Sequence, residues 1–357
     1  MLYQAENPHG GDNYGRAVRL DFSANLNPLG TPPRVVRALR EAAGELAQYP
    51  DPDCRELITA ISAQEAVPSE DILCGAGAAE LLYAYAHALR PTRAAQCAPT
   101  FLEYARAVSA VGGSMVSYAL RPEEQFSLRG DILSFLTRHK PEVFFLCNPN
   151  NPTGCCLSPE QLTQIISHCA QLGTRVVLDE CFLEFTQRKS MTPLLRRFPN
   201  LLIVKAFTKS YALAGVRLGY VLSADHALLA AMSAQTQPWN VSIPAQRAGI
   251  AALAEPDFMT RTRDYVLAAR SKLRQGLEQL GFCVIPSEAN FLLFRGQAGL
   301  DDALLAQGIR IRTCGNYPTL DARWYRVAVR TDEENAQLLA ALAFLCGKEK
   351  SLWPERS

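Results

Sequence analysis

The sequence predicts an α/β fold: a large domain with a mostly parallel sheet flanked by helices, plus a smaller α+β domain. The chain has 357 residues, which suits one large and one smaller domain. Through its middle, short apolar runs alternate with helical patterns, as expected for parallel strands buried by helices on both faces. After about Ile243 the pattern becomes helical and then mixed, which indicates a separate α+β unit.

Four divisions of the chain follow from these patterns. Residues 1–32 are rich in Gly, Asn and Pro without a sustained period, so we expect an ordered N-terminal arm. Apolar positions at helical spacing predict a helix over 33–47 that joins the small domain. The large domain is expected over 48–242 and opens with a second helix at 54–63, and the small domain is expected over 243–357.

The expected strands are short apolar runs bounded by polar or turn-forming residues. In the large domain these runs are 143–148, 175–180, 201–207 and 217–223, and a helical pattern covers 159–173. The small domain is expected to be mostly helical up to Leu280. Strand-like runs then follow at 282–287, 289–295, 309–314 and 325–330, before a closing helix at 333–344.

The charges of the chain nearly cancel, with 36 basic against 35 acidic side chains and a formal net charge of +1. This balance provides no strong field for nucleic acid or an anionic membrane, so a small-molecule substrate is expected. The first residues lack a basic stretch followed by an apolar one, and no apolar run approaches the roughly 18 residues of a transmembrane helix. We therefore expect a cytoplasmic location.

The eleven cysteines are expected to be reduced thiols, because their number is odd and a chain of this length needs no covalent staples. No pair has C-x-x-C spacing, and the five histidines form no H-E-x-x-H motif. We therefore expect no metal site, and buried, inert thiols are the simplest interpretation of the cysteines.

Four short motifs stand in order along the large domain. They are Asn148–Gly154 (N-P-N-N-P-T-G), Asp179-Glu180, Thr208-Lys209, and Arg217, which lies eight residues beyond Lys209. Each alone has an ordinary explanation as a turn, a helix cap, a solvated lysine or a surface arginine. Ligands of an open parallel sheet bind beyond the carboxyl ends of its strands, and three of these motifs are expected at that edge.

Together the motifs suit pyridoxal 5′-phosphate (PLP). This cofactor needs an amine for its aldehyde, an acid beside its ring nitrogen, a donor to its phenolic oxygen, a ring stacker and an anion site. Lys209 is the candidate catalytic residue, which would hold the aldehyde as a Schiff base. Asp179 can keep the ring nitrogen protonated, and Asn151 can donate to the phenolic oxygen.

The same order of motifs also supplies a phosphate site. Thr208 and Arg217 can bind the cofactor phosphate, aided by backbone N–H groups at the start of a helix. Those groups belong to the stretch 75–79, with Gly77 and Ala78 as the expected contacts.

The motifs N-N-P-T-G, V-V-L-D-E and T-K-x-x-A-L-A-G-V-R-L-G-Y resemble those of fold-type I PLP enzymes of the histidinol-phosphate aminotransferase subgroup. The resemblance extends over essentially the full length. It implies a homodimer in which Tyr104 of the segment 99–104 lies over the cofactor ring and Tyr49 reaches the phosphate in the partner subunit. Ordinary aromatic packing is the alternative for both tyrosines.

Within this subgroup, four segments resemble the L-threonine-O-3-phosphate decarboxylases of cobalamin biosynthesis. They are residues 9–11 (H-G-G), 20–30, the phenylalanine Phe182 of D-E-C-F, and 310–330. An aminotransferase is expected to have a tyrosine at Phe182, which would donate to the phenolic oxygen of the cofactor, whereas phenylalanine cannot. The chain departs from the pattern at Ala76, Ala78, Ala79 and Asn148, and the first three put side-chain phosphate contacts in doubt.

The resemblance also implies the substrate contacts. Arg326 is expected to bind the substrate carboxylate, with Asn151 nearby. Arg312, His9, the Gly10 amide and Asn25 are expected around the substrate phosphate; a surface ion pair or an incidental N-terminal histidine is the plainer alternative.

The implied reaction is decarboxylation of threonine phosphate to 1-amino-2-propanol O-2-phosphate. Three other possibilities stay open: a histidinol-phosphate aminotransferase, a decarboxylase of serine phosphate or a related compound, and a non-catalytic binding protein. The orientation of the substrate selects between decarboxylation and transamination, and the sequence does not reveal that orientation.

Overall fold

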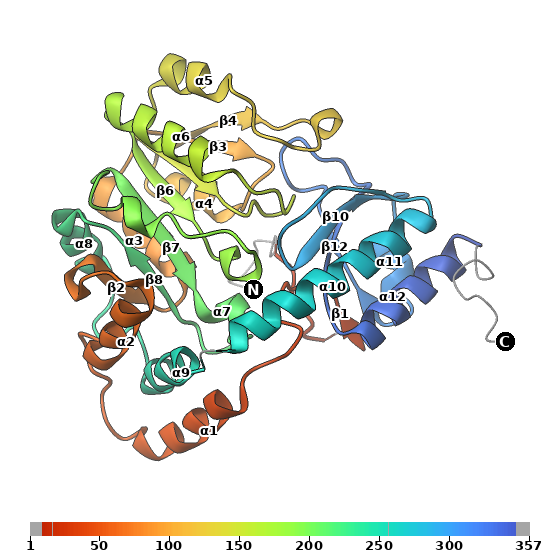
Figure 1. The fold of residues 1–357 in the computed structure, drawn as a ribbon, viewed down its shortest axis with the longest axis horizontal. Coiled ribbons are helices and arrows are strands. Elements are labelled where there is room, and N and C mark those ends of the chain that lie inside the picture. Colours follow the sequence, from red (N-terminus) through yellow and green to blue (C-terminus); the bar gives the residue numbers. More distant parts are fainter. Residues whose placement is uncertain (1–8, 16, 256, 348–357) are drawn as a thin grey trace.

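A seven-stranded sheet forms the centre of the large domain (Figure 1). The computed structural model describes residues 9–15, 17–255 and 257–347. The strands of the sheet, in chain order, are β2 (Ile72–Gly75), β3 (Arg93–Ala98), β4 (Ser114–Ala119), β5 (Val143–Cys147), β6 (Arg175–Asp179), β7 (Leu201–Ala206) and β8 (Gly219–Leu222). In space they follow the order β2-β8-β7-β6-β5-β3-β4. The four expected strands are confirmed as β5, β6, β7 and β8.

The sheet is mostly parallel, as predicted, but β8 is reversed. From β7 to β4 all neighbouring strands run parallel, whereas β8 runs antiparallel to both β7 and β2. A parallel connection needs a crossover that carries the chain back to the opposite end of the sheet. The segment 207–218 contains only the one-turn helix α7 (Phe207–Ser210), so the chain re-enters the sheet from the same end.

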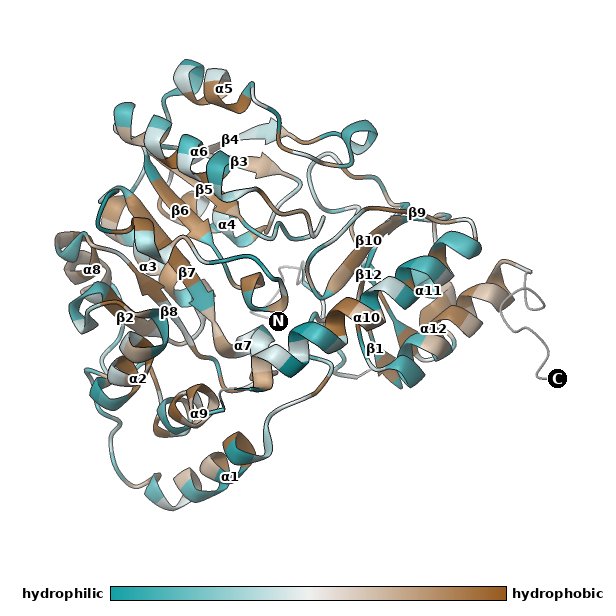
Figure 2. Cartoon of the chain, viewed as in Figure 1, coloured by the Kyte–Doolittle hydropathy of each residue, from teal (hydrophilic) through white to brown (hydrophobic). Residues whose placement is uncertain are grey.

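Side chains of the central strands alternate between two helical layers, because successive residues of a strand point to opposite faces. Phe144 and Leu146 of β5 belong to one core cluster, and Val143 and Phe145 belong to the other. The helices of the first cluster include α2 (Arg55–Glu65), α5 (Ile132–His139) and α6 (Pro159–Gln171), and those of the second are α3 (Ala78–Leu89), α4 (Glu103–Ala110) and α8 (His226–Ser233). Both faces of the strands are therefore apolar, and Figure 2 shows these strands mainly in brown.

Two helices pack on the large domain, although the sequence patterns assigned them to the small domain or to the segment that joins it. The helix expected over 33–47 is observed as α1 (Pro33–Ala42) followed by a 3-10 turn, and it lies against α9 (Ile243–Leu253) rather than against the small domain. Helix α9 also contacts α2, and its alanines lie in the same core as the central sheet. The boundary expected at residue 243 is therefore too early, because the apolar face of α9 is buried by the large domain.

The small domain has its own sheet and core. Its four-stranded antiparallel sheet has the order β12-β13-β10-β9, and a two-stranded parallel sheet pairs β1 with β11. The strands are β1 (Leu20–Asp21), β9 (Cys283–Val284), β10 (Phe291–Arg295), β11 (Ile309–Arg310), β12 (Arg312–Thr313) and β13 (Trp324–Ala328), and the helices are α10 (Phe258–Gln279), α11 (Leu300–Leu305) and α12 (Asp332–Leu345). Since β1 belongs to the N-terminal arm, the arm is part of this domain.

The helices differ in how they start. Ser158 and Gln161 form a reciprocal capping box at α6, and Thr331 and Glu334 form another at α12.

Within the described residues, no helix combines the length and the apolar character that crossing a bilayer requires.

Candidate active site

A cavity of about 460 Å³ lies where the carboxyl ends of the central strands face the small domain. Pockets that bind small molecules commonly have this size and position. Of the residues predicted for the site, the cavity is lined by His9, Gly10, Asn25, Ala78, Asn151, Asp179, Thr208, Lys209, Arg217, Arg312 and Arg326. The fold thus brings together most of the predicted residues from widely separated parts of the chain.

Lys209 projects into this cavity from α7, directly after β7. Burial lowers the pKa of its amine to about 8, with Arg326 and Arg217 adding to the effect. Lys205, four residues earlier, is also buried, but Glu180 and Glu65 outweigh the burial and raise its pKa. Its Nζ lies 2.7 Å from a carboxylate oxygen of Glu65. Only Lys209 of these two lysines therefore carries a substantial fraction of neutral, nucleophilic amine near neutral pH.

Asp179 ends β6 and also lines the cavity. The backbone N–H of Cys181 donates to its Oδ1 at 2.9 Å, and the Tyr104 hydroxyl donates to its Oδ2 at 2.6 Å. The carboxylate is thereby fixed in direction, and each oxygen keeps a further lone pair for a ligand.

Phe101, and not the Tyr104 that was expected over the cofactor ring, lines the wall of the cavity. Tyr104 is fully buried behind it, and the two rings meet edge to face with their centres 5.5 Å apart. Both aromatic residues belong to the same segment, and the sequence resemblance did not distinguish which one faces the ligand. The turn before α4 determines which ring faces the cavity, because it directs Phe101 toward the cavity and Tyr104 toward the core.

The N-N-P-T-G turn places Asn151 at the cavity, and hydrogen bonds fix the residues beside it. Asn150 accepts from Thr100 Oγ1 at 2.8 Å and donates to the Pro99 carbonyl at 3.0 Å. Asn148, which departs from the family pattern, accepts from the backbone N–H of Leu157 at 2.8 Å. The Asn151 side-chain oxygen accepts from Arg326, which leaves its amide N–H groups available to a ligand.

An anion cradle forms where the N-terminus of α3 meets Arg217. A Cβ on Gly77 would lie 2.6 Å from a terminal nitrogen of Arg217, so the absence of a side chain there admits the guanidinium. Gly77 also has a φ of +91°, which favours glycine. Ala78 and Thr208 line the cavity beside this guanidinium. The methyl side chains of the loop provide no hydrogen bonds, so any phosphate contact there must come from the backbone.

Arg312 and Arg326 face each other directly on neighbouring strands, β12 and β13. Both are buried, and burial, together with the neighbouring Arg312, lowers the pKa of Arg326. Arg326 donates to the Ser23 carbonyl at 2.8 Å, and Arg312 donates to Asn316 Oδ1 at 2.8 Å. Like charges directly opposite each other destabilise a sheet, so this pair indicates a site built for anionic groups.

The N-terminal arm closes one side of the cavity. A Cβ on Gly10 would lie 2.2 Å from the Ser23 carbonyl oxygen, so the arm packs tightly there. His9 Nε2 lies 2.5 Å from Glu103 Oε1, and its ring lies 5.5 Å from that of Phe101. The sequence did not predict Glu103, which becomes recognisable only when the arm is seen against α4. Asn25 is buried at the cavity beside this segment.

Tyr49 does not reach the cavity within one chain. Its side chain is 77% exposed, and its ring lies 4.5 Å from that of Trp239, which is itself 47% exposed. The expected contact across a dimer remains a prediction, because a single chain cannot test it.

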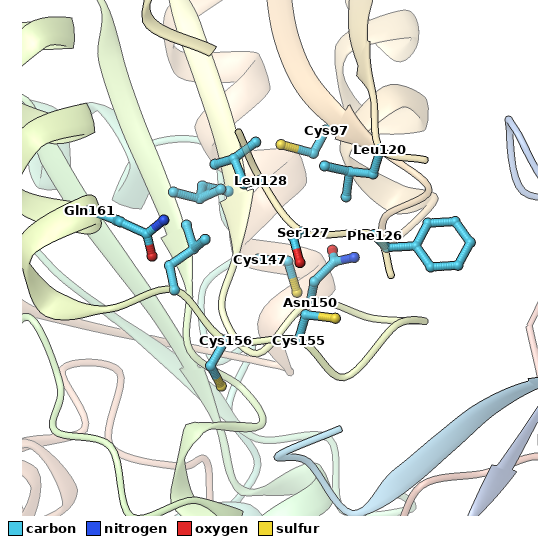
Figure 3. A pocket seen from close by; sticks show the side chains of 12 residues that line it. Cys97, Leu120, Phe126, Ser127, Leu128, Cys147, Asn150, Cys155, Cys156 and Gln161 are labelled. Carbon is cyan, nitrogen blue, oxygen red and sulfur yellow. The ribbon is translucent and has the colours of Figure 1, made fainter. Parts of the chain in front are cut away.

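A second, smaller cavity of about 160 Å³ shares Cys147 with the first. Figure 3 shows Ser127, Cys147, Asn150 and Cys155 gathered around it. Burial raises the pKa of Cys147, Cys155 and Cys156, which suppresses thiolate chemistry. Within the described ranges, no group of three or more His, Cys, Asp or Glu side chains is arranged to hold a metal ion.

The lining of the larger cavity fits PLP by its donor set. The structure supplies a buried amine, a fixed carboxylate, an amide donor, an aromatic wall and a cationic cradle that a side chain on Gly77 would fill. Each corresponds to one chemical requirement of that cofactor.

Comparison with known proteins agrees with this geometry. Residues 18–342 match the family described as aminotransferase class I and II. The chain is 38% identical to the threonine-phosphate decarboxylase of Salmonella typhimurium over 90% of each chain. It is 33% identical to the histidinol-phosphate aminotransferase of Anaeromyxobacter sp. over 94% of this chain and 93% of the relative.

Among solved structures, the histidinol-phosphate aminotransferase of Sinorhizobium meliloti in complex with pyridoxal 5′-phosphate superimposes with a TM-score of 0.84. That similarity covers 93% of this chain and 92% of the other, at 26% identity. The family match spans both domains and every residue of the anion cradle. The chain therefore belongs to the class I and II aminotransferase family.

Proposed function

We propose that this chain decarboxylates L-threonine O-3-phosphate with PLP as its cofactor, giving (R)-1-amino-2-propanol O-2-phosphate and CO₂ for the side chain of cobalamin. The observation that carries the proposal is the buried pair Arg312 and Arg326, which face each other in the cavity that also holds Lys209. Two guanidinium groups at one site suit a substrate with two anionic ends, a carboxylate and a phosphate.

The cofactor assignment rests on the family and on the donor set of the cavity. When bound, PLP accepts the electrons released as a bond to the substrate Cα breaks. Lys209 would hold the cofactor through its amine and return a proton to Cα. Asp179 would hold the proton of the ring nitrogen, and Asn151 would donate to the phenolic oxygen. Thr208, Arg217 and the backbone at Gly77 would bind the phosphate.

The substrate is oriented by groups from the arm and the small domain. Arg326, fixed by Ser23 and Asn151, would bind the α-carboxylate. Arg312, His9, Gly10 and Asn25 would surround the substrate phosphate. Since the two arginines lie on paired strands, they fix the carboxylate and phosphate relative to each other. This geometry determines which bond at Cα is aligned to break.

Phe182 favours decarboxylation over transamination in this proposal. It is buried at the cavity wall, and its ring contacts Phe291 edge to face at 5.0 Å. A tyrosine at this position would add a hydroxyl donor, which the hydrocarbon edge of Phe182 lacks. The 38% identity to a threonine-phosphate decarboxylase supports the same choice.

A histidinol-phosphate aminotransferase is the second candidate, favoured by relatives such as the one from Anaeromyxobacter sp. at 33% identity. Serine phosphate is an alternative substrate for the first candidate, because one methyl group changes binding by only about 1–3 kcal/mol. A non-catalytic binding protein would have no need of the buried, nucleophilic Lys209.

Two assays on the holoenzyme distinguish these functions. One measures release of labelled CO₂ from carboxyl-labelled threonine phosphate, and from serine phosphate in parallel. The other measures turnover of histidinol phosphate that depends on 2-oxoglutarate. We expect CO₂ release without appreciable transamination, and Lys209→Ala should abolish it. Efficient transamination with no CO₂ release would replace the proposed function by the second candidate.

We further propose that the chain is a homodimer in which Tyr49 contacts the cofactor phosphate of the partner subunit. The exposed Tyr49–Trp239 pair supports this assembly, because exposed aromatic patches commonly mark interfaces. Sedimentation at micromolar concentration should give the dimer mass, and a monomer that retains full activity would contradict the proposal.

A further inference from the structure

Tyr104 lies outside the cavity but contacts a residue that lines it. It is the second residue of α4, its side chain is 0% exposed, and its hydroxyl donates to Asp179 Oδ2 at 2.6 Å. The other oxygen of the same carboxylate accepts from the Cys181 backbone N–H. The shorter of these two hydrogen bonds to Asp179 therefore comes from a buried phenol.

The ring of Tyr104 is held on two sides, which fixes where its hydroxyl points. It stacks on Phe145 of β5 with ring centres 5.2 Å apart and an interplanar angle of 13°. The cavity-wall residue Phe101 meets it edge to face at 5.5 Å. Both neighbours are aromatic and apolar, so the hydroxyl finds its hydrogen-bond acceptor in Asp179 rather than in its packing partners.

The proton of this hydrogen bond belongs to the phenol. Burial and the charge of Asp179 raise the pKa of Tyr104 well above its ordinary value, so the hydroxyl remains protonated and donates. A hydrogen bond donated to a carboxylate is charge-assisted and favours the ionised form, which accepts a hydrogen bond from a protonated partner.

We propose that Tyr104 is a positioning residue whose hydroxyl orients the Asp179 carboxylate and keeps their shared proton on the cofactor's ring nitrogen. Its role is thus carried by its hydroxyl and not by stacking on the cofactor. The inference rests on the PLP assignment within the proposed function, but not on which substrate is used. Its central readout therefore requires no substrate.

Tyr85 provides a matched control. It is 1% exposed, and it meets Phe145 edge to face with ring centres 6.1 Å apart. Among the described residues its hydroxyl has no hydrogen-bond partner. Tyr104→Phe and Tyr85→Phe therefore each remove one buried hydroxyl beside the same phenylalanine, and only the first removes a contact with Asp179.

The experiment compares both variants as holoenzymes loaded with PLP labelled with ¹⁵N in the ring. We expect the ¹⁵N signal of Tyr104→Phe to show a smaller protonated fraction of the ring nitrogen than that of the wild type at the same near-neutral pH, and kcat to fall by about tenfold. KM should change less than about twofold, because the arginine pair is untouched. Tyr85→Phe should match the wild type in all three.

A double-mutant cycle tests whether Tyr104 acts on the ring nitrogen through Asp179. Added to Asp179→Asn, Tyr104→Phe should cause no further change in the ring-nitrogen signal. The proposal is overturned if Tyr104→Phe keeps the wild-type ring-nitrogen signal, or if it only unfolds at a lower temperature than Tyr85→Phe. Absence of decarboxylase activity in the wild type would instead count against the proposed function and leave the ¹⁵N test valid.

Discussion

Replacing Arg312 or Arg326 by alanine should separate the two ends of the substrate. Both side chains are buried and lie opposite each other on β12 and β13, so each is expected to bind one anionic group away from bulk water. Losing one partner of such a charged pair costs about 2–5 kcal/mol. At 1.4 kcal/mol for each factor of ten, kcat/KM should fall by roughly 30- to several thousand-fold.

The assay compares threonine phosphate with unphosphorylated threonine in both variants. Arg326→Ala should weaken turnover of both, since both carry an α-carboxylate, whereas Arg312→Ala should mainly reduce the preference for the phosphorylated substrate. Arg295→Ala is the control, because this residue of β10 is paired with Asp321 at 3.3 Å and its side chain is 43% exposed. Equal losses on both substrates in both active-site variants would refute the assignment of two separate anion sites.

Four further outcomes test the cofactor site. Lys209→Ala should lose the covalent attachment that borohydride fixes, measured by mass spectrometry. In the wild-type apo-protein the rate of PLP capture should rise with pH and level off above about pH 8, because the neutral amine reacts and its pKa is about 8. A rate independent of pH would argue against that amine. Asp179→Asn should bind PLP but lose most of its turnover, since an amide cannot stabilise a protonated ring nitrogen; turnover within a few-fold of wild type would make Asp179 a turn residue only. Gly77→Ala should weaken PLP binding at least about tenfold by displacing Arg217, as measured by equilibrium dialysis, whereas Gly112→Ala, also at positive φ but facing open space, should bind normally; equal affinities would contradict the role of the cradle.

The strands and the main cavity residues were predictable because local patterns specify them. Apolar runs such as 143–148 can be satisfied only by a strand buried on both faces. Lys209, Asp179 and Arg217 follow from the chemistry of one cofactor. The direction of β8 within the sheet was not predictable. Its reversal depends on a connection without a crossover helix, which the composition of the strand does not reveal.

The choice between Phe101 and Tyr104 shows the same limit on a smaller scale. Both are aromatic residues of one segment, but Phe101 lies in the turn before α4 and Tyr104 lies in its first turn, so the local backbone sets which ring faces the cavity. The hydrogen bond from Tyr104 to Asp179 spans 75 positions of the sequence, so no local pattern contains it. The contact of His9 with Glu103 spans 94 positions and escapes prediction for the same reason.

The attachment of the N-terminal arm affects how the chain completes its fold during synthesis. The backbone N–H of Asn27 donates to the Lys209 carbonyl at 3.1 Å, and the Phe22 carbonyl accepts from Ala328 at 2.8 Å. Arg326 reaches the Ser23 carbonyl across 303 positions. Because the arm is synthesised long before β13, it must wait, unpaired, until that strand has been made. The central sheet can assemble earlier, but the cavity closes only after β13 has emerged.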